Sequence, residues 1–548
     1  MSKMEKRVIV LLFVVFFLVG LVAVQGYGIN VDENTEIDIA RMDLKEYVRL
    51  VGGEESSLFR YMDSLIGDLM DSVEIAHGEA LLYPAAAVVS VLRMIGRTDL
   101  GMLFYHMYLY VWFLVGLLAA YQTGKFLTGK ISGGAMAAAC LGLNPLLFGM
   151  SFINNKDMIM LSLTCICIYL GIRFVEQKTW KWSVAWGISA AFCLNMRIIG
   201  LAYIGLFGLL YLYEFWTKKR DRTTFRNGVI ALLTVIVVFL AVTPATWYSP
   251  IGYFTYTISS SAEFLRLDNW ELYRGEIYNY LQKPLPWHYF FVMFGVSTPI
   301  VFLAIFLLGQ AGSACLLIHD LKRKAVEGRM KYILIFQVIV WVPMLYFVIK
   351  GAHVTFRHFW FMYPELAFTG VYARCRLCRG RKAERIAGAM FGAQAVVCAV
   401  MLIAGHPFQT TYFNVLAGPG ADTRFAYVNT DYYKEALERI LTMDDGDDIL
   451  ISSDNLNCYF GVKQAWEILH PDKKARIRIA PPDTEECAQA DYHVYGQSVL
   501  VQENMMAEQG VGEAVFCEPE EKYDSSLPLK AYGKTVVTIW YNSSASRE

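Results

Sequence analysis

Long uncharged apolar runs constrain this 548-residue chain more than any other feature. Val8–Val24 and Val229–Tyr248 contain no charged residue, and each is close to the roughly 20 residues that a helix needs to cross a bilayer. Charged residues make up only 18% of the chain, against about 25% in a typical soluble domain. We therefore predict a polytopic α-helical membrane protein. The net charge of −1 gives no support for nucleic-acid binding.

The order of apolar and basic segments predicts how the chain is threaded. Lys3, Lys6 and Arg7 precede the first run, so we expect an uncleaved first span with a cytoplasmic N-terminus. The stretch 183–216 is too long for one span and is expected to break at Asn195–Arg197. Ten further spans are predicted near 101–121, 131–150, 158–172, 183–196, 198–216, 229–248, 288–310, 331–349, 357–373 and 386–404.

The short apolar segment Ala80–Val91 decides the orientation of everything that follows it. If it crossed the membrane, the basic connections near 124–130, 218–226, 322–331 and 374–385 would lie outside, against the positive-inside tendency. We therefore predict a helix on the membrane surface there. About eleven spans result, and the odd number places the C-terminus on the extracytoplasmic face.

Two regions are predicted from this threading. Residues 1–405 form a transmembrane module, with a long first extracytoplasmic loop at 26–100. Residues 406–548 form a small extracytoplasmic α/β domain, with strands expected at Ile449–Ser452, Ile477–Ile479 and Thr535–Trp540. In this tail Thr430 is expected to cap a helix that runs through Tyr432–Leu441.

Ionisable residues gather at several joints on the outer face of the predicted membrane. Such groups are costly next to a bilayer and are candidates for function. The acidic ones offer a general base, and the arginines offer planar forks of donors for a phosphate. The absence of a Gly-rich nucleotide loop fits a lipid-linked donor better than a nucleotide donor. The residues in question are Asp32, Glu33, Lys156, Asp157, Arg197, Arg357 and His358.

Several fragments in order along residues 1–440 resemble the C-type (GT-C) membrane glycosyltransferases of family 39, the group of protein O-mannosyltransferases and aminoarabinose transferases. The fragments are Asp32-Glu33 after the first span, Asn144–Gly149 followed by Asn155–Asp157, Tyr273–Glu276 with Leu285–Tyr289, Arg357–Pro364, and His406–Gln409 with Tyr412–Asn414 and Thr430–Tyr432. They are most similar to bacterial members.

The resemblance implies a GT-C fold and an inverting transfer of a sugar from a polyprenyl-phosphate donor on the extracytoplasmic face. Matched by position, Asp32 would be the catalytic base, Glu33 its neighbour and Asp157 the second acidic residue. From charge and side of the membrane we assign the donor phosphate to Lys156, Arg197 and Arg357, with His358 beside them.

Four residues of the loop before the span at 288–310 are substrate-binding candidates. Arg274 and Glu276 lie in a matched fragment, with an ion pair between the two as the alternative interpretation. Trp287 and Tyr289 are candidates for stacking on a sugar, with an aromatic belt at the membrane surface as the alternative.

Other classes of function remain open. A transporter or flippase of lipid-linked or small polar substrates is the main alternative, but it should place charges inside spans near the midplane, whereas these lie at span ends. A membrane anchor for a functional outer domain is a second alternative. No cofactor or metal site is predicted. The acceptor, whether protein, lipid or cell-wall glycan, and the hexose or pentose transferred are not determined by the sequence.

Overall fold

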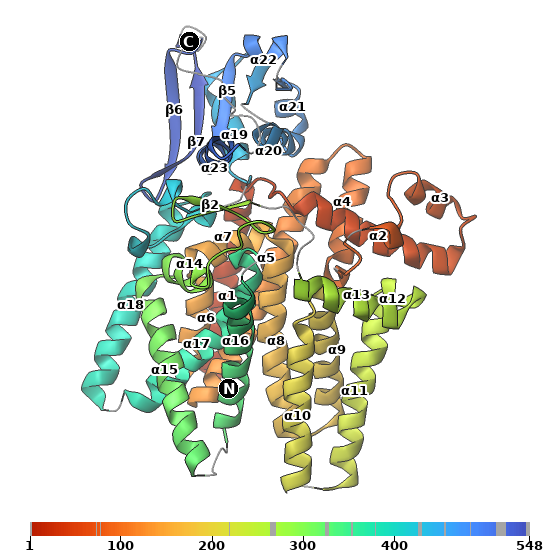
Figure 1. Ribbon diagram of the computed structural model, residues 1–548, viewed down its shortest axis with the longest axis vertical. Coiled ribbons are helices and arrows are strands. Elements are labelled where there is room, and N and C mark those ends of the chain that lie inside the picture. The colour runs from red at the N-terminus through yellow and green to blue at the C-terminus, as the bar shows by residue number, and fades with distance from the viewer. Residues whose placement is uncertain are drawn as a thin grey trace.

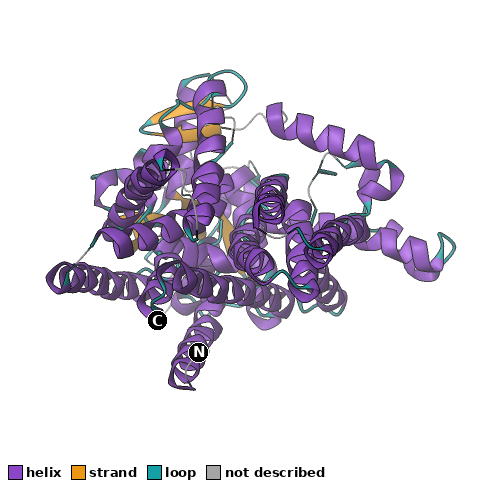
Figure 2. Ribbon diagram, turned by 90° about the horizontal axis from the view of Figure 1, so that it is seen from below, coloured by secondary structure: helices purple, strands orange, loops and turns teal. Residues whose placement is uncertain are grey.

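The computed structural model describes residues 3–72, 74–76, 78–218, 220–263, 270–323, 328–351, 354–378, 380–425, 430–453, 456–482, 484–510 and 522–543. A bundle of long helices forms the lower part of the molecule, and shorter helices and a sheet lie above it (Figure 1). Seen from below, helices make up nearly all of the visible ribbon (Figure 2). The polytopic helical architecture predicted from the apolar runs is confirmed.

Seven helices in the described part of the chain are long and apolar enough to cross a membrane, or up to eight if a bent pair counts as one span. The pair is α6 (Ile131–Gly142) and α7 (Pro145–Ile153), whose axes differ by 65°. The single helices are α1 (Lys3–Ala23), α5 (Thr98–Thr128), α8 (Asn155–Gln177), α11 (Arg222–Val242), α15 (Ile300–Lys322), α16 (Met330–Lys350) and α18 (Arg381–Ala404). The predicted number of eleven is therefore not confirmed.

Three other helices stand in the bundle beside these. They are α9 (Trp180–Met196), α10 (Gly200–Lys218) and α17 (Tyr363–Leu377) (Figure 1). The break between α9 and α10 confirms the predicted division at Asn195–Arg197. The predicted single span at 288–310 is wrong. The chain forms the short helix α14 (Tyr289–Ser297), and α15 starts only at Ile300, because Pro299 has no N–H to continue a helix and disfavours helical backbone in the residue before it.

The segment after α1 forms an upper layer at one end of the bundle. It contains α2 (Glu33–Gly52), α3 (Ser57–Asp63) and α4 (Tyr83–Met94), joined there by α12 (Ala245–Tyr248) and α13 (Pro250–Glu263) (Figure 1). The apolar helix Ala80–Met94 is shorter than a span, and α4 lies above the bundle rather than within it, as predicted for a surface helix. A hairpin of β1 (Trp270–Tyr273) and β2 (Glu276–Asn279) completes the layer.

The tail carries a five-stranded sheet in the order β4-β3-β5-β7-β6. The strands β3 (Ile449–Ser452), β4 (Ile477–Ile479) and β7 (Lys534–Tyr541) confirm the three predicted ones, while β5 (Tyr492–Gly496) and β6 (Ser525–Ala531) were not expected. The first three strands along the chain are parallel, and β7 is antiparallel to both of its neighbours. The tail helices are α19 (Tyr433–Met443), α20 (Leu456–Glu467), α21 (Pro471–Lys474), α22 (Glu485–Gln489) and α23 (Gln497–Glu508).

The predicted cap of the first tail helix is wrong. Residue Tyr432 precedes α19, and no side chain caps this helix. The Thr430 hydroxyl instead donates to the carbonyl oxygen of Ile29 at 2.8 Å, and the Gly28 N–H donates to the carbonyl oxygen of Asp431 at 3.1 Å. These bonds fasten the tail to the segment that follows α1, where the first acidic motif lies.

Candidate active site

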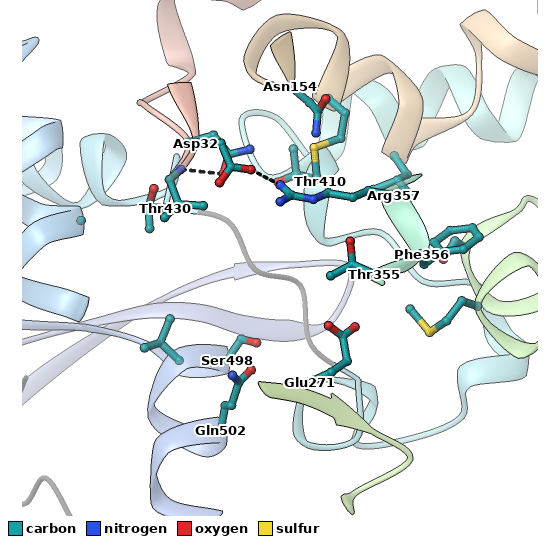
Figure 3. Close-up of a pocket in the computed structure, with 18 of the residues that line it drawn as sticks. Asp32, Asn154, Glu271, Thr355, Phe356, Arg357, Thr410, Thr430, Ser498 and Gln502 are labelled. Carbon is teal, nitrogen blue, oxygen red and sulfur yellow. Dashed lines mark hydrogen bonds and ion pairs between the residues drawn. The ribbon is translucent and has the colours of Figure 1, made fainter. Parts of the chain in front are cut away.

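A cavity of about 560 Å³ lies between the tail and the end of the bundle next to it. Its inner wall comes from the turn before α2, the end of α7 and the 3₁₀ helix at Phe356–Met362, and its outer wall comes from α20 and α23 (Figure 3). Elements that are hundreds of residues apart in sequence therefore share one concave surface. Such a surface, with a few convergent polar groups, is the usual form of a substrate site.

Asp32 and Arg357 form an ion pair on the wall of this cavity (Figure 3). Asp32 is the last residue before α2, and Arg357 stands in the 3₁₀ helix after α16. Their side chains are 36% and 29% exposed, so both remain accessible from the cavity. The Nε–H of Arg357 is buried and donates to no acceptor within the described residues.

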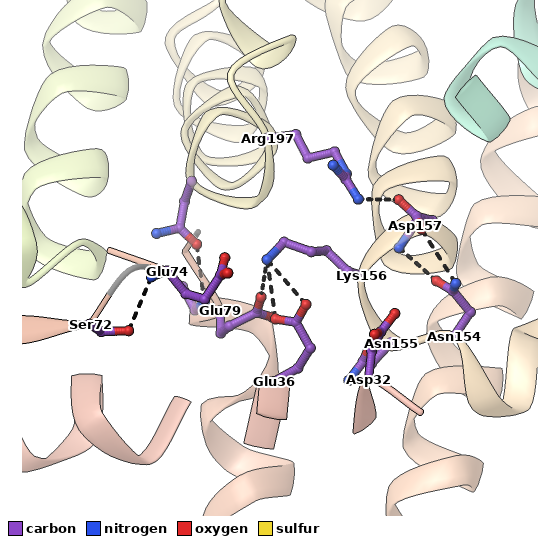
Figure 4. Close-up of polar contacts among 12 residues, drawn as sticks. Asp32, Glu36, Ser72, Glu74, Glu79, Asn154, Asn155, Lys156, Asp157 and Arg197 are labelled. Carbon is purple, nitrogen blue, oxygen red and sulfur yellow. Dashed lines mark hydrogen bonds and ion pairs between the residues drawn. The ribbon is translucent and has the colours of Figure 1, made fainter. Parts of the chain in front are cut away.

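Asp157 lies next to Arg357 but is not among the residues that line the cavity. It forms an ion pair with Arg197, and its Oδ2 lies 3.9 Å from Nε of Arg357 (Figure 4). Asn154 holds the start of α8: its Oδ1 accepts from the N–H of Asp157 at 2.8 Å, and its Nδ2 donates to Oδ2 at 3.3 Å. The four side chains Asp32, Arg357, Asp157 and Arg197 thus alternate in charge. Arg357 is the link between the two acidic motifs predicted from the sequence.

His358 follows Arg357 in the same 3₁₀ helix and interacts electrostatically with Asp157. Its backbone N–H donates to the carbonyl oxygen of Thr355 at 3.2 Å. The side chain is not among those that line the cavity. The predicted phosphate contact of His358 therefore gains no direct support from its position.

Lys156 points to the other side of α8 from Asp157 (Figure 4). Its ammonium lies 2.7 Å from a carboxylate oxygen of Glu79 and 3.1 Å from one of Glu36, and its side chain is only 5% exposed. The buried Glu79 and the partly buried Glu36 already pair with this charge, and Lys156 does not line the cavity. The structure places Lys156 in a link between α8 and the upper layer rather than beside Arg357.

Glu33 is fully buried and does not line the cavity. Its side chain accepts from the N–H of Asn30 at 2.8 Å, which closes the turn that presents Asp32, and lies 3.0 Å from Nε2 of His106. Burial raises the pKa of Glu33, and His106 opposes this shift. Its contacts make Glu33 a support for the neighbouring aspartate.

The four predicted substrate residues separate into two groups. Arg274 and Glu276 are exposed at the turn of the β1–β2 hairpin, where Arg274 adopts a left-handed φ of 56° and Glu276 pairs with Lys283 at 3.2 Å. Trp287 is 62% exposed and does not line the cavity. Tyr289 alone of the four lines it.

Glu271 is a cavity residue that the sequence did not reveal. It lies on β1, is 5% exposed, and accepts hydrogen bonds from the hydroxyls of Tyr289 at 2.7 Å and Tyr280 at 3.1 Å. Burial raises the pKa of Glu271, and the two tyrosine hydroxyls oppose the shift. A single acid in an aromatic-rich loop carries no motif, and only the fold shows that it faces the cavity (Figure 3). Within the described residues, no three His, Cys, Asp or Glu side chains gather as metal ligands.

Asp431 sits where the tail meets the first loop. Its side chain is buried, Oδ2 accepts from the Thr410 hydroxyl at 3.4 Å, and Oδ1 has no partner in the described part of the chain. Burial raises the pKa of Asp431 to about 7, and the nearby Glu33 adds to this rise. The folded protein therefore holds a proton at Asp431 at pH values where the unfolded chain, with a pKa of about 3.9, has lost it.

This difference predicts a pH-dependent stability. Because the folded state binds more protons, Asp431 makes the protein less stable as pH rises from about 4 to about 7. Asp431→Asn should remove this contribution and gain on the order of 4 kcal/mol over the wild type at pH 8, but not at pH 4. Thermal unfolding in detergent across this range measures it, with the exposed Asp445→Asn as control. An unchanged pH dependence in Asp431→Asn would contradict the prediction.

The bundle, the sheet of the tail and the cavity between them define a polytopic membrane protein with a concave, polar site at one end of the bundle. This is the architecture that the resemblance to C-type glycosyltransferases implies. Residues 84–248 match the family model described as dolichyl-phosphate-mannose-protein mannosyltransferase, which confirms the resemblance for this part of the chain. The matched segment contains Lys156, Asp157 and Arg197, but neither Asp32 nor Arg357.

Two solved structures show a distant similarity. ArnT from Cupriavidus metallidurans bound to undecaprenyl phosphate is 13% identical with a TM-score of 0.42, and the alignment covers 98% of this chain and 99% of that one. An oligosaccharyltransferase from Archaeoglobus fulgidus in the apo form is 10% identical with a TM-score of 0.40, covering 81% and 64%. No curated protein sequence matches the chain significantly. At 13% and 10% identity, neither solved structure supports a conclusion about the reaction that this chain performs.

Proposed function

We propose that the chain is an integral membrane glycosyltransferase that transfers a sugar from a polyprenyl-phosphate donor to an acceptor hydroxyl or amine on the extracytoplasmic face. The observation that carries this proposal is the pair of Asp32 and Arg357 on the wall of one cavity. A proton acceptor and a cation stand side by side there. These are the two groups that displacement of a lipid phosphate by a neutral nucleophile requires.

The proposed step is a single displacement at the anomeric carbon. The acceptor oxygen or nitrogen forms the new bond to that carbon, while its proton passes to a carboxylate oxygen of Asp32. The bond between the carbon and the phosphate oxygen breaks, and its electron pair stays on the departing lipid phosphate. Arg357 offsets that charge through guanidinium N–H groups that Asp32 does not engage. One displacement inverts the anomeric configuration.

Asp157 and Arg197 support this step by holding Arg357 in place. Asp157 is 5% exposed and lies between the two guanidinium groups. Because Arg357 contacts a carboxylate on either side, its position relative to Asp32 is set by the start of α8 as well as by its own helix. We expect the lipid to approach from the bundle, and the acceptor from the side covered by the tail.

Transfer of radiolabelled sugar tests the proposal. Membranes containing the full chain are supplied with a panel of polyprenyl-phosphate sugars, and the label is followed into protein, lipid and glycan fractions. We expect covalent incorporation from at least one donor, with release of free polyprenyl phosphate in equal amount. Movement of intact labelled donor across the membrane without any new bond would replace the proposal by the transporter alternative.

A further inference from the structure

A second cavity, of about 540 Å³, lies at the opposite end of the bundle from the candidate active site. It is formed by the end of α5, the start of α6, the end of α17 and the start of α18. The lower end of α18 in Figure 1 marks its position. None of the residues assigned to sugar transfer lies there.

The walls of this cavity carry four cations and one anion. The cations are Lys130, Arg374, Arg381 and Arg385, and the anion is Glu384. Glu384 accepts from Lys130 at 2.7 Å, and its backbone carbonyl oxygen accepts from Arg374 at 3.4 Å. The Nε–H of Arg374 is buried and donates to no acceptor among the described residues.

Two further features lie beside these charged side chains. Thr128 and Ser132 also line the cavity, and the first turn of α6 contributes to its wall, with backbone N–H groups that a helix leaves unpaired at its start. Positive side chains around the start of a helix are suited to phosphate groups.

The neighbouring surface distinguishes a lipid from a soluble anion. Immediately after Arg385, α18 presents exposed apolar side chains along its length: Ile386 is 52% exposed, Met390 55% and Val397 46%. This helix has only 6% of its most apolar window buried against the rest of the protein. A polar headgroup in the cavity would therefore have its acyl chains beside an apolar helix face.

We propose that this cavity binds the phosphate headgroup of an anionic phospholipid from the leaflet opposite the candidate active site. The cations contact the phosphate, and the outer face of α18 contacts the acyl chains. Basic cavities between membrane helices commonly bind such headgroups, with each nearby Lys or Arg contributing about fivefold in affinity. The site does not depend on the proposed sugar transfer, and each can fail without the other.

Binding of phosphatidylglycerol labelled in its acyl chain tests the proposal on the purified full chain in neutral detergent. The variant Arg381→Gln/Arg385→Gln removes two cavity cations. We expect it to bind about 25-fold more weakly than the wild type, with an unchanged unfolding midpoint in lipid-free detergent. Unlabelled phosphatidylglycerol should displace the probe, whereas phosphatidylcholine should not.

A matched control uses two cations outside the cavity. Lys322 and Arg323 are exposed at the end of α15 and do not line it, so Lys322→Gln/Arg323→Gln should bind phosphatidylglycerol like the wild type. An equal loss of phosphatidylglycerol binding in this control would mean that general surface charge attracts the lipid, and it would overturn the proposed site. Displacement by inorganic phosphate at the same concentrations as by the lipid would overturn the lipid and leave a soluble phosphate compound as the ligand.

Discussion

Asp32→Asn is expected to lower the rate of sugar transfer by about a hundred- to ten-thousand-fold. The amide has nearly the same shape as the carboxylate but cannot take a proton from the acceptor. Asp32 is 36% exposed, and its partner Arg357 still has the carboxylate of Asp157 at 3.9 Å when Asp32 is replaced. The change should therefore lower the stability of the protein only slightly. Initial rates and donor binding are measured on the same preparation, and only the rates should fall.

Asp38→Asn is the matched control for this prediction. Asp38 lies on α2, the helix that follows Asp32, is 48% exposed and also pairs with an arginine, Arg41 at 2.7 Å, but it is not among the cavity residues. We expect its transfer rate to stay within about twofold of the wild type, because it lies away from the reacting groups. Near-normal transfer by Asp32→Asn would remove Asp32 from the mechanism and make Glu271 the next carboxylate to test.

The sequence predicted the helical bundle well because membrane spans require continuous apolar runs. It failed at Pro299, where the run continues on both sides but the backbone cannot. In the tail, the strands at Ile449–Ser452 and Ile477–Ile479 are rich in β-branched residues and were found. Strand β6 includes Pro528 at the sheet edge, and β5 includes the buried His493. Neither strand has a residue pattern that predicts a strand from the sequence alone.

The candidate site was predictable in its residue types but not in its pairings. Asp32, Asp157 and Arg357 are candidates from the sequence because ionisable residues at the ends of spans are costly next to a bilayer. Lys156 was selected on the same ground, yet neighbouring residues on a helix point about 100° apart. Once Asp157 faces Arg357, Lys156 must face elsewhere, and it meets Glu36 and Glu79. Which of the two faces Arg357 depends on packing between distant segments.

Arg357→Gln is expected to lower kcat by about 10²- to 10³-fold, the usual cost of removing one group that stabilises charge in a transition state. The change leaves Asp157 paired with Arg197, so the fold should survive, which thermal unfolding can verify. Arg357→Lys should recover only part of the rate, because a single ammonium cannot reproduce a planar fork between two carboxylates. Arg274→Gln, at the exposed hairpin turn, serves as the control and should be near wild type.

Comparing two donors separates stabilisation of the leaving group from positioning of Asp32. A polyprenyl-pyrophosphate sugar has a less basic leaving group than the monophosphate and needs less help from a cation. If Arg357 offsets the charge of the departing phosphate, the loss in Arg357→Gln should be smaller with the pyrophosphate donor than with the monophosphate. Equal losses with both donors would mean that Arg357 acts through Asp32 alone. In that case the guanidinium of Arg357 does not contact the departing lipid phosphate, and the cation that offsets its charge must be sought at Arg197.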